Sequence, residues 1–144
     1  MTEVVSTDFD WVSARAACSS SQVFRSLQLE VQTDVEKRNE IRTPNDKSKY
    51  LFRYAANESR FSVFVESLFT EMKELEQIGA IFVRTPSGVD VQTLANQLLL
   101  RGEITLSNDK KCRIKVGDVE YDSWQFRKLA LQNVFFIEVG RWRP

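Results

Sequence analysis

Apolar residues recur at helical spacing in one long segment of the chain. Val23, Leu27, Val31 and Val35 stand four residues apart, which places their side chains along one face of an α-helix. Charged residues occupy many of the positions between them. The pattern predicts an amphipathic helix over about residues 22–41, long enough at ~1.5 Å per residue to span a small domain.

Helices are also expected on either side of the central part of the chain. Residues 8–17 form a predicted short helix that stops at a run of serines, residues that favour helix ends. Further on, Asp122 or Ser123 can cap a helix that begins at Trp124.

The central part alternates apolar and polar positions, as half-buried β-strands do. Turn residues separate the alternating segments. Residues 103–106 and 111–116 form a predicted hairpin, in which Ile104 and Leu106 face the apolar positions of the returning strand. The predicted strands are residues 50–55, 60–65, 80–84, 103–106, 111–116 and 119–121.

Three segments fit more than one structure. Residues 65–78 alternate at first and then take helical spacing, so we expect a strand that passes into a helix, with continued strand pairing as the alternative. Residues 89–100 favour a helix by propensity, with Gly102 able to end it. Residues 134–139 have strand composition, and either continue the last helix or leave it.

These elements predict an α+β fold in a single globular domain over residues 1–144. A mainly antiparallel sheet, about residues 50–121, is packed by the long N-terminal helix and the C-terminal helix. The length of 144 residues suits one domain.

Charge changes the picture of possible partners. The chain carries 20 basic and 20 acidic side chains, a formal net charge of zero. Neutrality gives no overall attraction for nucleic acid or an anionic membrane, and it removes a repulsion between copies. No apolar run approaches the ~18–20 residues that span a bilayer. We therefore expect a homo-oligomer or another protein as partner.

The two cysteines, Cys18 and Cys112, lie far apart in the sequence and make no metal-binding spacing. One bridge between them is possible, but two reduced and buried thiols are the expected state. The first residues lack the basic and apolar regions of a signal peptide. The sequence therefore predicts a cytoplasmic location.

The chain contains no histidine, which removes the usual general base near neutral pH and the commonest metal ligand. No catalytic residue, metal site or cofactor is expected, and an enzyme using carboxylates or Tyr121 has no motif to support it. Glu30 and Asp34 share a helix face, but Lys37 and Arg38 beside them favour a surface network of charges.

Two groups of residues are candidate ligand sites. The aromatic side chains of Phe52, Tyr54, Phe61 and Phe82 are predicted to line a pocket between the sheet and the long helix, unless they fill the core. A helix N-terminus attracts anions, so an anion site is predicted at the start of the last helix, where a cap is the structural alternative. Its residues are Tyr121, Asp122, Ser123 and Trp124.

Two surfaces remain. Phe135, Phe136 and Trp142 form a predicted apolar interface at the C-terminal end. The last third of the chain has nine basic and six acidic residues. Its basic side chains could bind phosphates weakly; those considered are Lys110, Lys111, Arg113, Lys115, Arg141 and Arg143. Alternating Arg113 and Lys115 are more typical of a solvated strand face.

The favoured hypothesis is a small intracellular protein-interaction module without catalysis, which associates with itself. Abundant aromatic residues, formal neutrality and the long amphipathic helix support it. The alternative is a domain that binds an apolar or anionic small molecule between the sheet and the long helix. The third hypothesis is weak nucleic-acid binding through the basic C-terminal third.

Overall fold

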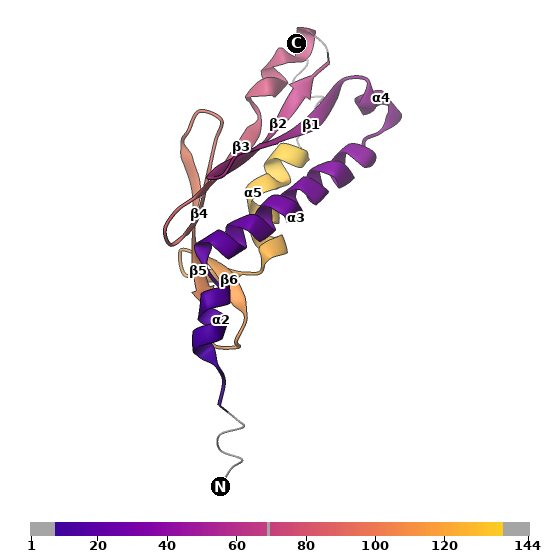
Figure 1. Cartoon of the computed structure of the whole chain (residues 1–144). Helices are drawn as coiled ribbons and strands as arrows, with labels where there is room; N and C mark the ends of the chain where they lie inside the picture. Colours follow the sequence, from indigo (N-terminus) through magenta and orange to yellow (C-terminus); the bar gives the residue numbers. More distant parts are fainter. Residues whose placement is uncertain (1–7, 69, 137–144) are drawn as a thin grey trace.

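A computed structural model of the chain describes residues 8–68 and 70–136. One seven-stranded antiparallel sheet runs in the order β1-β2-β3-β4-β5-β6-β7, and helices α3 and α5 lie side by side against it (Figure 1). The α+β class and the two packing helices predicted from the sequence are confirmed. The elements are α2 (Trp11–Ala17), α3 (Ser20–Glu40), α4 (Pro44–Lys47), β1 (Tyr50–Ala56), β2 (Arg60–Ser67), the 3-10 helix η1 (Thr70–Gln77), β3 (Gly79–Arg84), β4 (Gly88–Gln92), β5 (Leu98–Leu106), β6 (Cys112–Val116), β7 (Val119–Tyr121) and α5 (Ser123–Phe135).

The predicted apolar stripe of α3 is its buried face. Leu27, Val31 and Val35 are buried together with Phe24. The helix begins at Ser20, two residues before the predicted start, and the Ser19 side chain caps it by accepting a hydrogen bond from the backbone N–H of Gln22 at 3.3 Å. The stripe therefore covers part of the sheet, at β1, β3 and β4, and α5 packs against β3, β6 and β7.

Aromatic rings make the centre of this contact. The ring of Phe61 stacks on that of Phe82 with centroids 4.6 Å apart, and Phe24 of α3 lies 5.1 Å from Phe61. Further along, Phe52 meets Phe135 of α5 edge to face at 5.3 Å. Two groups of rings thus join the helices to the sheet, one at Phe24 of α3 and the other at Phe135 of α5.

The helix predicted over residues 89–100 is wrong. This region forms β4, a loop in which Asn96 has a φ of +67°, and the first part of β5. Val89 and Val91 are fully buried at alternate positions, so burial on the sheet overrides the helix propensity of the residues that follow. Gly102 lies within β5, where a Cβ would lie 3.0 Å from the Phe126 ring.

The other two ambiguous segments, residues 65–78 and 134–139, agree in part with the structures predicted for them. The strand β2 ends at Ser67 and the chain then forms η1, so the predicted passage from strand to helix is confirmed, with a 3-10 helix as the helical part. Helix α5 continues through Val134 and Phe135. Residues 137–139 lie outside the described part of the chain.

The prediction of two reduced, buried thiols is wrong. Cys18 and Cys112 form a disulfide with Cα atoms 5.4 Å apart, a normal separation for such a bond. Cys18 is buried at the α2–α3 junction, while Cys112 is exposed at the start of β6. The sequence separation of 94 residues hid the contact, because only the folded sheet brings β6 beside this junction.

The exposed edge of β1 is closed by polar side chains near the end of α3. The Asn39 amide donates to the Phe52 carbonyl and accepts from the Phe52 N–H, each at 2.8 Å. Arg42 donates to the carbonyl of Tyr50. These contacts occupy groups that an edge strand otherwise offers to another chain.

We expect Asn39→Ala to lower the free energy of unfolding by about 1–3 kcal/mol, because it leaves both backbone groups of Phe52 without their partner. The matched control is Glu40→Ala, which removes an exposed neighbour and should change the value by less than about 0.5 kcal/mol. Urea denaturation measures both. Equal values for the two variants would contradict this role of Asn39.

We expect no free thiol in the native protein, because the bond joins the two cysteines of the chain. Alkylation before and after reduction, followed by intact mass measurement, counts the thiols. Reduction should destabilise the protein by on the order of 2–5 kcal/mol, and a Cys18→Ala/Cys112→Ala variant should not respond to reductant. Two alkylated thiols in the unreduced protein would overturn this pairing.

Candidate functional site

A groove of about 300 Å³ runs along the outer seam between α3 and α5. Its floor is apolar, since Leu131 and Phe135 of α5 lie at its base and are themselves almost fully buried. Ile41, Trp124 and Phe136 line its sides, and each of these side chains is more than half exposed. Large apolar side chains gathered around one depression are typical of an interaction surface.

The two helices are joined through Arg127 of α5. Its guanidinium group pairs with Asp34 at 2.9 Å and with Glu30 at 3.1 Å, and the Ser123 hydroxyl also donates to Glu30. The two carboxylates do share one face of α3, as their spacing predicts, but that face points at α5. Instead of a free surface network, they bridge the helices.

Arg38 closes the seam at the other end of the groove. It donates to the carbonyl of Phe135 at 2.7 Å, and its guanidinium carbon lies 5.0 Å from the ring centroids of both Phe52 and Phe136. This arrangement holds the exposed Phe136 ring against a cation. Phe136, the C-cap residue of α5, therefore lies at the rim of the groove.

The rim of the groove is basic. Its lining contains Lys37, Arg38, Arg127 and Lys128 but only one carboxylate, Asp34. Arg127 is neutralised by its two acidic partners. Neither Lys37 nor Lys128 takes part in an ion pair in the part of the chain that the structure describes. A bound surface that carries carboxylates would therefore gain attraction there.

The four predicted pocket residues pack against the inside of the fold. Phe52, Phe61 and Phe82 are buried, and Tyr54 is half-buried with its ring 5.9 Å from that of Phe61. The Phe61 ring contacts those of Tyr54 and Phe82 and that of Phe24 in α3, whereas the Phe52 ring meets Phe135 of α5. The groove lies on the outer side of the α3–α5 seam, and its lining does not include these four residues.

The predicted anion site is a built helix cap. Asp122 pairs with Arg113 at 3.0 Å, and its backbone N–H donates to Gln125 at 2.9 Å. With Glu30 at Ser123, carboxylates of the chain itself surround the N-terminus of α5. Trp124 lines the groove and also, together with the half-buried Tyr121, a second depression of about 210 Å³ beside it.

The predicted interface residues divide three ways. Phe135 is buried in the core, Phe136 is exposed at the rim of the groove, and Trp142 lies outside the described residues. Sequence reasoning missed Ile41, Lys37 and Lys128 as members of the same surface. Their spacing on α3 and α5 is visible in the sequence, but nothing in it says that these two helices are neighbours.

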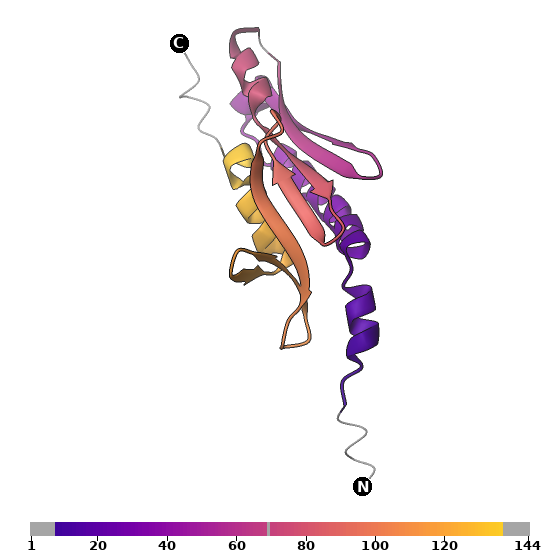
Figure 2. The same ribbon diagram turned by 90° about the vertical axis from the view of Figure 1, so that its left-hand side faces the viewer.

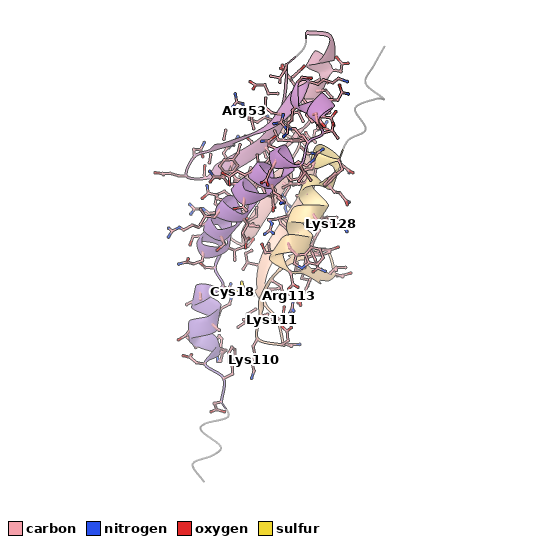
Figure 3. The ribbon with its side chains drawn as sticks, turned by 90° about the vertical axis from the view of Figure 1, so that its right-hand side faces the viewer. Cys18, Arg53, Lys110, Lys111, Arg113 and Lys128 are labelled. Atoms are coloured by element: carbon pink, nitrogen blue, oxygen red, sulfur yellow. A yellow bond between two sulfur atoms is a disulfide. The ribbon has the colours of Figure 1, made fainter. Side chains whose placement is uncertain are left out.

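The basic residues near β6 are interleaved with acidic ones. Arg113 pairs with Asp109 and Asp122, while Lys115 stands between Glu103 and Glu120 in the sheet register. Lys110 lies 5.2 Å from the Phe9 ring centroid. Figure 3 places Lys110, Lys111 and Arg113 on the β5–β6 side of the molecule and Lys128 apart from them on α5. These contacts break up a continuous basic stripe.

Comparison with protein-family models, curated proteins and solved structures finds no match for this chain. Across residues 8–68 and 70–136, no helix has the length and apolar character needed to cross a membrane. The same residues contain no group of three or more acidic or cysteine side chains placed to hold a metal ion. Support for a function of the groove therefore comes from its lining residues and their contacts.

Burial raises the pKa of Asp34, and the charge of Arg127 lowers it again in part. We therefore expect Arg127→Met to raise this pKa further, which NMR titration measures. Because the folded-state pKa lies above the unfolded value, the contribution of Asp34 to stability is fully present below the unfolded pKa and is lost as pH rises through the folded one. The destabilisation by Arg127→Met should consequently grow between about pH 3 and pH 7.

Lys128→Met is the matched control, because it removes a neighbouring cation that forms no ion pair among the described residues. It should leave the titration of Asp34 nearly unchanged. A pKa that stays fixed in Arg127→Met would contradict the electrostatic link between the helices.

Proposed function

We propose that this protein is a non-catalytic interaction module that associates with itself through the α3–α5 groove. The observation that carries the proposal is the ring of exposed apolar side chains, Ile41, Trp124 and Phe136, around an apolar floor. Burying such side chains removes them from water, which is the main driving force of protein association. Formal neutrality of the chain adds no repulsion between copies.

The surface also suits a second candidate function, the binding of an apolar ligand that carries a negative charge. Lys37 and Lys128 beside an apolar floor favour such a molecule, and about 300 Å³ lies at the lower end of the volumes of ligand pockets. The groove is open along its length, whereas small-molecule sites enclose most of the ligand surface. We therefore favour a macromolecular partner. Nucleic acid is disfavoured by the acidic residues that interleave with Arg113 and Lys115.

The redox state of the Cys18–Cys112 pair bears on the cellular compartment in which the protein resides. Disulfides persist in oxidising compartments and are rare in the cytosol. The cytoplasmic location expected from the sequence therefore requires that this pair be reduced in the cell. An oxidised pair in protein isolated from its own source would favour a location outside the cytoplasm.

We expect the protein to sediment above its monomer mass of 16.7 kDa at micromolar concentration. Phe136→Ser should weaken this association at least tenfold, roughly 1.4 kcal/mol, because it removes an exposed ring at the rim of the groove. The matched control is Leu99→Ser, which removes an apolar side chain of β5 that is also more than half exposed. Sedimentation equilibrium over a hundredfold range of concentration measures all three proteins.

Thermal melts establish that both variants are folded. A wild-type protein that stays monomeric over the whole range would remove the proposal of self-association and favour the ligand. Equal weakening by Leu99→Ser would place the contact elsewhere.

A further inference from the structure

The N-terminal arm, which we define as residues 8–12, carries a second exposed apolar surface. Trp11 and Val12 are 63% and 61% exposed, and Phe9 is also exposed. Helix α2, which begins within the arm, buries none of its own residues. A helix that buries nothing lacks the tertiary packing that stabilises most short helices. Apart from Lys110, which lies 5.2 Å from the Phe9 ring centroid, the arm leaves its apolar side chains, Trp11 and Val12 above all, open to solvent among the described residues.

Acidic side chains accompany the apolar residues of the arm. Asp8 and Asp10 are both exposed, and Asp10 also caps α2 by accepting from the Ser13 N–H at 3.1 Å. The arm contains no basic residue. It thus presents aromatic and aliphatic side chains between two carboxylates.

The groove and the arm are complementary in chemistry and size. The groove offers an apolar floor beside Lys37 and Lys128, which matches apolar side chains beside carboxylates. The arm runs into α2, whose seven residues are about 10 Å long at ~1.5 Å per residue, and the segment of α3 that lines the groove, Asp34 to Ile41, is of similar length. Two groove surfaces face to face would instead bring together two surfaces that each carry more basic than acidic side chains.

The arm of a chain cannot reach its own groove. Helix α2 lies beyond the first turn of α3, whereas the groove lies along its last turns, and Figures 1 and 2 show α2 projecting from the opposite end of the molecule. The disulfide at Cys18 fixes the base of α2 to β6. Any arm in the groove must therefore come from a second copy.

We propose that the arm of one copy docks into the α3–α5 groove of another, with Trp11 and Val12 on the apolar floor and Asp8 and Asp10 toward Lys37 and Lys128. This inference rests on the proposed self-association and names the surface that fills the groove. The contact joins two different surfaces, so two copies either exchange arms reciprocally or continue as a chain.

The test uses two variants of the full-length protein that damage opposite sides of the contact. Trp11→Ser removes the main apolar side chain of the arm, and Lys37→Glu/Lys128→Glu reverses the charge of the groove. All three positions are exposed, so both variants should keep their melting temperatures. We expect each variant alone to associate at least tenfold more weakly than the wild type. Val119→Ser, an exposed apolar position on β7, serves as the control and should behave as the wild type.

The mixture of the two variants decides whether the contact is arm to groove. The groove of the Trp11→Ser protein and the arm of the charge-reversed protein are both intact, so a one-to-one mixture should form heterodimers at concentrations where each variant alone is monomeric. Raising the salt concentration from about 50 to 500 mM should weaken the association of the wild type, because exposed charges are screened.

The outcomes separate this inference from the proposed function. A monomeric wild type would remove both. A wild type that associates, together with a Trp11→Ser protein that associates equally well, would overturn the arm as occupant and leave self-association through the groove. A mixture that associates no better than either variant alone would also overturn the arm-to-groove arrangement.

Discussion

The burial of one face of α3 against the sheet is the contact on which the rest of the structure depends. Leu27 and Val31 have no exposed surface, and Phe24 continues the ring layer formed by Phe61 and Phe82. This burial fixes the rotation of the helix about its own axis. Once the apolar stripe faces the sheet, the directions of all its other side chains follow from ~3.6 residues per turn.

Three further features follow from that fixed rotation. Asn39 is directed at the edge of β1 and replaces a neighbouring strand there. Glu30 and Asp34 are directed at α5 and receive Arg127. Lys37 and Ile41 are left on the outer side of the α3–α5 seam, where the groove opens. The closed edge, the helix bridge and the open surface are thus three consequences of one packing contact.

The elements that could be predicted from sequence are those whose burial is periodic. The stripe of α3 and the alternation in β2, β3 and β6 identify their elements without tertiary information. Residues 89–100 are a case in which the propensity of leucine, glutamine and alanine favours a helix, whereas the buried positions of Val89 and Val91 favour the strand that forms. The β4–β5 pairing that decides between them is a contact with the rest of the sheet.

The candidate site was less predictable than the fold. The sequence assigns Phe136 and Trp124 to two different predicted sites, and the structure brings both to one groove. The Cys18–Cys112 contact and the Arg127 bridges join residues more than ninety positions apart. The pattern of apolar and polar residues within one element does not depend on which distant element packs beside it. Such contacts therefore cannot be predicted from local patterns.

The Cys18–Cys112 bond has a consequence for the integrity of the chain. It encloses α3, α4, η1 and the strands β1 to β5 in one covalent ring. A single break of the backbone anywhere in that ring, for example in the loop between β4 and β5, would leave one molecule rather than two fragments. The helix that packs on the sheet would then stay attached to the strands that it covers, and a nicked chain could keep the shape of the intact one.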